Sequence, residues 1–184
     1  MNMVGTQTIE TERLILRKFV MEDAGDMYMN WCCDKEVTKY LTWLPHENVA
    51  VTKAILNEWI PMYENGNYFN WVMELKETGR IIGNISVVKL REDIGSADIG
   101  YCMGRVYWGK ELMPEALKAV MDYLFDVVLI NRIAASHDAN NPKSGRVMEK
   151  TGMKKEGILR QAGMNNQGIC DEVWHAMLRS DRLG

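Results

Sequence analysis

The chain lacks any excess of basic residues: 22 lysines and arginines stand against 25 aspartates and glutamates among 184 residues, a formal net charge of -3. No stretch interleaves lysine and arginine with aromatic residues, so nothing in the sequence resembles a footprint for nucleic acid. A long apolar run is also missing, because the most apolar stretch, residues 119–130, contains Asp122 and Asp126. The amino terminus has no basic-then-apolar signal pattern. We expect no direct nucleic-acid ligand, no membrane span and a cytoplasmic location.

Cysteine and histidine are scarce and scattered. The four cysteines and three histidines show neither the spacing of metal ligands nor a framework of paired cysteines. They are Cys32, Cys33, Cys102, Cys170, His46, His137 and His175. We therefore expect no metal. No repeat, charge block or stretch rich in Pro, Gly and Ser divides the chain, and a hydrophobic content of 47% is enough for one packed core. The sequence predicts a single domain over residues 1–184.

The most informative region covers residues 97–129. An alternating strand over 97–104 passes through Trp108-Gly109-Lys110 into an amphipathic helix that opens at Pro114. The first amides of a helix have no internal acceptor and carry partial positive charge, so a glycine-containing loop before them can hold a phosphate or pyrophosphate. One glycine is a weak signal, and the alternative is an ordinary loop between a core strand and a core helix.

A second strand-loop-helix segment follows. Residues 131–137 are typical of a buried strand, Asn141-Pro142 of a helix cap and first turn, and Gly152 of the end of a short helix. The remaining elements are predicted from periodicity and turn residues. They are a strand over 14–19, helices over 22–33 and 47–64 with a bend or end near Pro61, and hairpins that turn at 77–80 and 165–168. Strands at both ends with helices between them predict a mixed α/β sheet.

Several short motifs in a fixed order together resemble the GNAT superfamily of N-acetyltransferases, in particular the RimJ/RimL-type branch that acts on ribosomal-protein amino termini. The motifs are Thr11-Glu-Arg-Leu-Ile-Leu-Arg17, Ile82-Gly83, Asp98-Ile-Gly-Tyr101, Tyr107-Trp-Gly-Lys110, Glu115-Ala116, Asn141-Pro-Lys-Ser144, Glu149-Lys-Thr-Gly152 and Glu156-Gly157. The resemblance implies the GNAT acyl-CoA N-acyltransferase fold: a mixed, mostly antiparallel sheet flanked by helices, whose two central parallel strands, here 97–104 and 132–137, splay to admit acetyl-CoA.

The same resemblance implies where acetyl-CoA binds. The pyrophosphate is expected against the amides of residues 108–112 and the pantetheine along residues 101–103. The implied cofactor-binding set is Tyr101, Cys102, Met103, Trp108, Gly109, Lys110, Glu111, Leu112 and Asn141.

Three positions depart from the family pattern. Val106 stands where the pyrophosphate loop usually has Arg or Gln, Glu111 where it has a second Gly or Ala, and Met148 where many relatives have a tyrosine acid. A carboxylate near a pyrophosphate is repulsive unless it turns toward Lys110 or solvent. These departures keep open a second class of function, a non-catalytic acyl-CoA-binding or regulatory domain.

The implied chemistry is attack of an amine on a thioester, which requires a neutral amine and a leaving thiolate. At pH 7 an α-amine with a pKa of about 7.8 is roughly 14% neutral, whereas a lysine side chain is roughly 0.04% neutral, so an α-amine needs only a modest base. Asp98 is the candidate base, against the alternative of a solvated or ion-paired carboxylate. Glu74 is the rival base, although strand alternation would let it face solvent.

Two further residues are weighed for the chemistry. Ser144 is the candidate acid for the leaving thiolate, and its alternative is a first-turn serine that binds the backbone. Cys102 could be an acyl-carrying nucleophile, but a small buried residue is the stronger interpretation of a lone strand cysteine.

Aromatic residues concentrate in the first half of the chain, which forms the acceptor groove in relatives. Tyr40 and Trp43, in a loop-like stretch, are the candidate substrate-binding residues, whereas Trp59 and Trp71 are interpreted as core. The acceptor is expected to be the α-amino terminus of a protein or peptide, and a small amine such as an antibiotic, polyamine or amino acid is the alternative. Monomer and homodimer both remain open.

Overall fold

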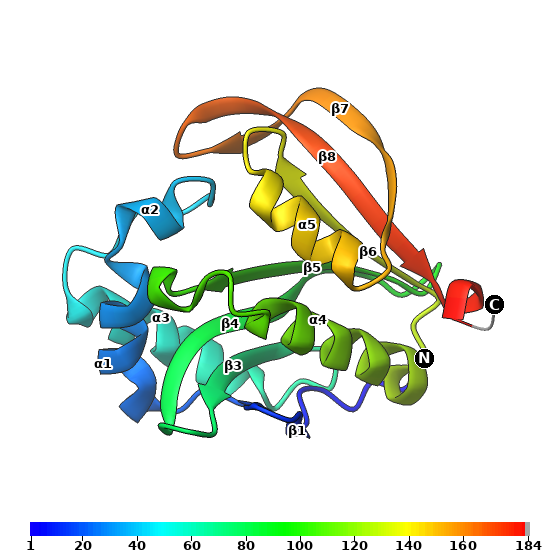
Figure 1. The fold of residues 1–184 in the computed structure, drawn as a ribbon. Coiled ribbons are helices and arrows are strands. Elements are labelled where there is room, and N and C mark those ends of the chain that lie inside the picture. The colour runs from blue at the N-terminus through cyan, green and yellow to red at the C-terminus, as the bar shows by residue number, and fades with distance from the viewer. Residues whose placement is uncertain (183–184) are drawn as a thin grey trace.

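One mixed sheet of eight strands forms the centre of the computed structural model, which describes residues 1–182 (Figure 1). The strand order is β1-β2-β3-β4-β5-β6-β8-β7, and all neighbours are antiparallel except β5 and β6. This confirms the predicted mixed, mostly antiparallel sheet with one parallel pair. The strands are β1 (Ile9–Glu10), β2 (Leu14–Arg17), β3 (Asn70–Leu75), β4 (Arg80–Arg91), β5 (Ser96–Met103), β6 (Arg132–Asp138), β7 (Lys154–Asn165) and β8 (Gly168–Leu178). Residues 183 and 184 of the predicted domain lie outside the described residues.

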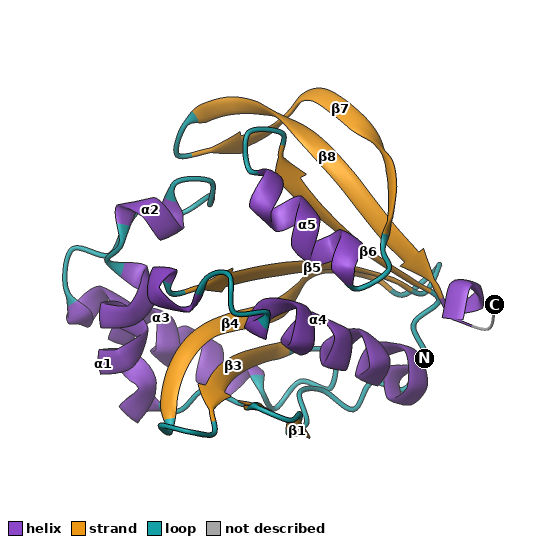
Figure 2. Cartoon of the chain, viewed as in Figure 1, coloured by secondary structure: helices purple, strands orange, loops and turns teal. Residues whose placement is uncertain are grey.

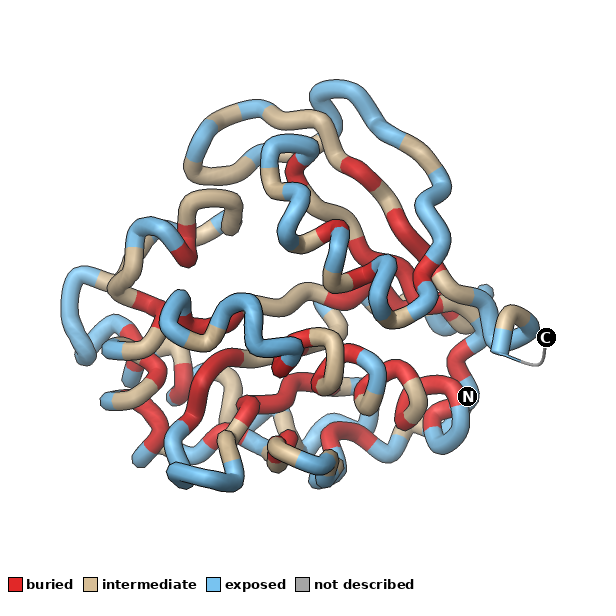
Figure 3. Tube along the Cα trace, in the orientation of Figure 1, coloured by how far each residue is buried: buried red, intermediate tan, exposed pale blue. Residues whose placement is uncertain are grey.

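Helices cover both faces of the sheet, and the buried side chains between helices and sheet form two separate hydrophobic clusters (Figures 2 and 3). On one face α4 packs against β5 and β6, with Leu117 and Val120 beside Ile99 and Ile133 in the larger cluster. On the other face α1 and α3 cover β3 and the start of β4 in a second cluster. The helices are α1 (Ala24–Met27), α2 (Lys35–Thr38), α3 (Val49–Met62), α4 (Leu112–Tyr123) and α5 (Pro142–Lys150). In the described part of the chain, no helix is long and apolar enough to cross a membrane.

Two predicted helices differ from those observed. The helix expected over 22–33 is divided into a 3-10 turn (Met21–Asp23), α1 and a π turn (Tyr28–Cys32). Its tight first turn is fixed by the Asp23 carboxylate, which accepts hydrogen bonds from the Val20 amide and from Arg17. Helix α4 begins at Leu112, two residues before the predicted start at Pro114. Glu111 has a left-handed backbone (φ 61°) and lies outside the helix, so the helix starts at the residue that follows it. Pro114 still lies in the first turn, where a missing N–H costs no helical hydrogen bond.

Strands β5 and β6 pair over only three residues before they separate. The parallel register is Ser96↔Arg132, Ala97↔Ile133 and Asp98↔Ala134, with no pair beyond it in the described strands. Opposite this point, β4 has a register shift between Val87 and Lys89, and such a bulge bends a strand and increases its local twist. The two strands therefore leave a gap between their carboxyl-terminal halves, which is the predicted splay.

One polar cluster fastens the start of α4 to the turn between β1 and β2. Glu115 Oε1 accepts hydrogen bonds from Thr11 Oγ1 (2.5 Å) and from the Arg13 amide (2.9 Å), and Oε2 accepts one from Arg13 Nε (2.7 Å). Burial of Glu115 disfavours its ionised form, but these hydrogen bonds outweigh burial and lower its pKa. Two motifs that lie about a hundred residues apart in the sequence thus meet as donor and acceptor.

This cluster makes stability depend on pH. Because the pKa of Glu115 is lower in the folded chain than its ordinary value of 4.5, its contribution is present above that value and is lost as pH falls through the folded pKa. Glu115→Gln should lower the free energy of unfolding at pH 7 by about 1.5–3 kcal/mol. The deficit relative to wild type should shrink below about pH 4.5.

Urea denaturation at several pH values measures this difference. Glu58→Gln, at an exposed position of α3, is the matched control and should leave stability nearly unchanged at every pH. A Glu115→Gln deficit that stays constant down to pH 3 would contradict the assignment.

Candidate active site

The loop between β5 and α4 presents free backbone amides. Gly109 and Glu111 both have left-handed backbones (φ 74° and 61°), and the indole of Trp108 is anchored by a 2.7 Å hydrogen bond to the Met103 carbonyl. Among the described residues, the amides of 109–113 have no hydrogen-bond acceptor, whereas the Trp108 amide donates to the Arg105 carbonyl. Four of the five amides predicted for a pyrophosphate, those of 109–112, are therefore available, and the Trp108 amide is not.

Arg13 holds this loop from the side of the sheet. Its Nη1 donates to the Lys110 carbonyl (2.9 Å) and its Nη2 to the Glu111 carbonyl (3.3 Å), while its Nε is engaged by Glu115. The guanidinium thus satisfies the loop carbonyls and leaves the loop amides for an outside anion. Nothing in the sequence near residue 110 points to Arg13, because the two are joined only by the fold.

The Glu111 carboxylate forms an ion pair with Lys150 of α5 (2.5 Å) and not with the neighbouring Lys110. Lys143 of α5 lies 5.1 Å from the centroid of the Trp108 ring. Two lysines of α5 therefore reach across to the loop: Lys143 adds positive charge beside Trp108, and Lys150 offsets the charge of Glu111.

On the same face of the sheet, Tyr101 reaches across the gap to Ser144. The Tyr101 hydroxyl lies 2.9 Å from the Ser144 carbonyl oxygen and 3.0 Å from Ser144 Oγ. Since the carbonyl only accepts, Tyr101 can donate to it while Ser144 donates to Tyr101. Burial raises the pKa of Tyr101, so its phenol stays protonated. This contact fixes the first turn of α5, whereas the family resemblance predicts only cofactor binding for Tyr101.

Met148 lies within α5, and Asn141 immediately precedes this helix. Met148 is buried in the larger hydrophobic cluster, so the position of the relatives' tyrosine faces the core. Asn141 was expected to cap α5, but its side chain makes no capping hydrogen bond. Its backbone carbonyl accepts from the Ser144 amide instead (3.1 Å), because Pro142 at the first helical position pre-sets the turn.

Cys102 and Met103, the other two residues of the predicted pantetheine stretch, turn their side chains into the protein. Met103 is buried in the larger cluster. The Cys102 thiol donates to Asn84 Oδ1 at 2.9 Å, and burial raises its pKa to about 12. A thiol that stays protonated at neutral pH is a poor nucleophile, which favours the interpretation of Cys102 as a buried filler.

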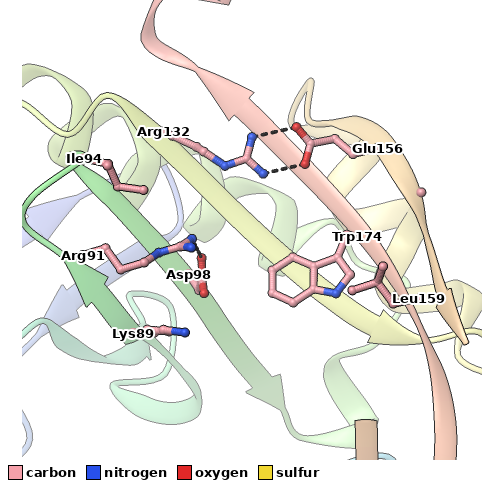
Figure 4. A pocket seen from close by; sticks show the side chains of 9 residues that line it. Lys89, Arg91, Ile94, Asp98, Arg132, Glu156, Leu159 and Trp174 are labelled. Carbon is pink, nitrogen blue, oxygen red and sulfur yellow. Dashed lines mark hydrogen bonds and ion pairs between the residues drawn. The ribbon is translucent and has the colours of Figure 1, made fainter. Parts of the chain in front are cut away.

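Asp98 lies at the apex of the gap on the sheet face opposite α4 (Figure 4). Its Oδ1 accepts a hydrogen bond from Arg91 Nη2 at 3.1 Å, and its Oδ2 has no partner among the described residues. The ion-pair alternative is therefore present, yet one carboxylate oxygen remains free to accept a proton. Glu74 is ion-paired and partly exposed: its carboxylate accepts from Arg17 Nε at 2.6 Å, and 22% of its side chain is exposed. The catalytic role of Asp98 stays a prediction.

Tyr40 and Trp43 lie in a loop that the β7–β8 turn holds in place. Asn166 Nδ2 donates to the Trp43 carbonyl (2.7 Å) and to the Thr38 carbonyl (2.9 Å), and its amide donates to the Leu41 carbonyl (3.1 Å). The Trp43 ring packs against His46, with ring centroids 5.4 Å apart. Asn166 thus joins segments more than a hundred residues apart, while substrate binding by Tyr40 and Trp43 stays a prediction.

The fold is that of an acyl-CoA-dependent transferase, as comparison with known proteins shows. The family described as "Acetyltransferase (GNAT) domain" matches residues 13–154. The chain is 31% identical over 178 residues to an uncharacterized N-acetyltransferase, p20, of Bacillus licheniformis, covering 97% of this chain and 99% of that protein. The chain belongs to the GNAT family, and it is an N-acetyltransferase.

Two further proteins are similar to this chain. The [ribosomal protein uS5]-alanine N-acetyltransferase of Escherichia coli is 32% identical over 130 residues, 70% of this chain and 65% of that protein. The structure of Mycobacterium smegmatis RimJ in complex with CoA-disulfide superposes with a TM-score of 0.86, at 21% identity, over 95% of this chain and 88% of that one. At 21% identity, the similarity to the RimJ structure shows only that the two proteins share a fold.

Glu111 provides a test of the loop. A left-handed backbone costs a non-glycine residue roughly 1–2 kcal/mol, so Glu111→Gly should stabilise the loop. It should also tighten CoA binding by up to about tenfold, because it removes a negative charge and frees Lys150. Both effects are measured by thermal unfolding and by calorimetric titration with CoA at low and high salt.

Glu111→Gln separates charge from backbone strain. This control removes the charge but keeps the left-handed side chain, so it should share the gain in CoA affinity, attenuated by salt, without the gain in stability. Weaker CoA binding in both variants would mean that Glu111 contributes favourably through its pairing with Lys150.

Proposed function

We propose that this N-acetyltransferase transfers the acetyl group of acetyl-CoA to the α-amino terminus of a protein or peptide. The observation that carries the proposal is the arrangement around the gap between β5 and β6. A carboxylate with a free oxygen, Asp98, lies at its apex on one face of the sheet, and a hydroxyl pair, Tyr101 and Ser144, spans it on the other. Two proton-handling groups on opposite sides suit a reaction in which an amine loses a proton and a thiolate gains one.

The residues around the gap fit the pyrophosphate and pantetheine of CoA. Free amides at 109–113, and Lys110, Lys143 and Lys150 nearby, suit a pyrophosphate. The unpaired edge of β5 past Asp98 supplies backbone groups for the pantetheine amides. When bound, acetyl-CoA supplies a thioester-activated acetyl group.

Asp98 is the group that accepts the proton of the amine, directly or through a water. Its Oδ1 is held by Arg91, which fixes the carboxylate and leaves Oδ2 to act. A carboxylate is a weak base, and this suits an α-amine, of which roughly 14% is already neutral at pH 7. A lysine side chain would require far more assistance from the same group.

Ser144 Oγ carries the proton that the departing thiolate takes up, and Tyr101 positions Ser144. Because a thiol has a pKa near 8.5, the leaving group needs little acid assistance. The absence of the relatives' tyrosine at Met148 therefore fits a working enzyme. The names of two similar proteins also support the proposal, since one acts on the alanine of ribosomal protein uS5 and the other is called RimJ.

The experiment is release of CoA thiol from acetyl-CoA with short peptides bearing free or blocked α-amines, aminoglycosides and polyamines. We expect turnover with free α-amino peptides and loss of turnover when the amine is blocked. Asp98→Asn should lower turnover by roughly a hundred- to ten-thousand-fold at neutral pH with CoA affinity nearly unchanged. Rising pH should partly rescue it, because more α-amine becomes neutral unaided.

Three outcomes would change the proposal. A loss smaller than threefold in Asp98→Asn would remove Asp98 from the mechanism. Turnover confined to aminoglycosides or polyamines would establish a small-amine acceptor instead. Binding of CoA without turnover of any amine would establish the binding-domain alternative.

A double-mutant cycle tests the positioning role of Tyr101. Tyr101→Phe keeps the ring and removes the hydroxyl, and we expect turnover to fall by roughly tenfold with little change in the KM for acetyl-CoA. If Tyr101 acts through Ser144, the same change should have no further effect in a Ser144→Ala background. Equal losses in both backgrounds would assign Tyr101 a purely structural role.

A further inference from the structure

A cavity of about 470 Å³ opens beside Asp98 on the sheet face opposite α4 (Figure 4). Lys89 and Arg91 extend from β4 toward Asp98 on one side, and Arg132 and Trp174 stand on the other. We call this cavity, lined by Lys89, Arg91, Asp98, Arg132, Glu156 and Trp174, the basic subsite. It is large enough for a short side chain with its backbone.

The charges of the basic subsite do not balance. Arg91 pairs with Asp98 at 3.1 Å, and Arg132 pairs with Glu156 through both Nη1 and Nη2. Lys89 has no carboxylate partner among the described residues 1–182, so one positive charge is left over in a chain whose net charge is -3. The subsite therefore attracts an anionic group and repels a cation.

Arg91 also has hydrogen-bonding capacity to spare. Its Nη2 donates to Ser96 and to Asp98, while Nε is buried without a partner and Nη1 donates to no described residue. A guanidinium has five N–H donors, so Arg91 can bind a carboxylate of the acceptor and keep its contact with Asp98. Opposite it, the Trp174 indole is held by a 3.0 Å hydrogen bond from Nε1 to Glu172, which presents an apolar wall.

We infer that the basic subsite receives a carboxylate of the acceptor next to the amine that is acetylated. This inference rests on the proposed function, because it places the amine at Asp98. Since Arg91 contacts Asp98 directly, the amine and the carboxylate of the acceptor lie within about one residue of each other, a Cα spacing of about 3.8 Å. The preferred acceptor is an amino terminus with Asp or Glu as its first or second residue, and polycationic amines are disfavoured.

The subsite also assists the chemistry. Asp98 and the acceptor carboxylate both favour the ammonium form of the bound amine, and Lys89 and Arg91 offset this effect, so the amine loses its proton more readily than it would without them. Two further carboxylates lie on the Trp174 side of the subsite. Glu172 accepts the hydrogen bond of Trp174, and Asp138, its partner across β6 and β8, accepts one from Asn165. These two carboxylates oppose the positive charge of Lys89 and would favour a basic acceptor.

The test compares three peptides that begin Ala-Glu, Ala-Gln and Ala-Lys and are otherwise identical. We expect kcat/KM to fall in that order, by roughly tenfold between neighbours at low salt and by less at high salt. Lys89→Glu should reverse the order, because it changes the excess charge of the subsite from positive to negative. Lys53→Glu, an equal charge change at an exposed position of α3, should preserve it. Calorimetric binding of the same peptides to the CoA-saturated protein gives a readout without turnover.

Each outcome decides one of the two proposals. The expected order, reversed by Lys89→Glu alone, supports the inference. Equal rates for the three peptides, or a preference for Ala-Lys, would overturn the inference and leave the proposed function intact. If no peptide is acetylated but Ala-Glu binds most tightly and loses this advantage in Lys89→Glu, the anion subsite stands and the proposed function fails. If no peptide is acetylated and the three peptides bind equally well, both the inference and the proposed function are overturned.

Discussion

The structure depends on the short pairing of β5 with β6, which ends at Asp98 and Ala134. Backbone hydrogen-bonding groups need partners, so two neighbouring strands that part inside a protein leave edges that a ligand can satisfy. The register shift of β4 lies opposite the same residues and bends the sheet where β6 leaves β5. The apex of the gap, the candidate base and the mouth of the basic subsite therefore fall at one place, which explains why a thioester and an amine could meet there.

A gap of this kind has to be held open by contacts around it. Arg13, held by Glu115, fixes the loop before α4, and Tyr101 fixes the first turn of α5 across the gap. Lys150 reaches from α5 to Glu111 at the outer end of the same loop. These contacts are polar and local, so they can position an anion-binding loop without filling the gap with side chains, as apolar packing would.

The electrostatics of the two sides of the gap differ. On the side of α4, free amides and lysines gather where phosphates would bind. On the opposite side, the candidate base Asp98 lies among two arginines and a lysine without a carboxylate partner among residues 1–182, although the chain as a whole is acidic. Such a region suits an acceptor that arrives with a neutral amine and a nearby negative charge more than one with several positive charges.

The sequence by itself determined the order and type of most elements, because apolar periodicity and turn residues are local signals. The parallel strands over 97–104 and 132–137, the hairpins at 77–80 and 165–168 and the helix ended by Gly152 are all present as expected. Motif order was likewise sufficient for the family. Only the tertiary structure decided which side chains face each other: Arg13 against the loop of Glu111, Tyr101 against Ser144, Glu74 against Arg17, and Arg91 against Asp98. Spacing along a chain carries no information on contacts between distant segments. The partners of each candidate residue, and with them its chemistry, follow from the register of the strands and the packing of the helices.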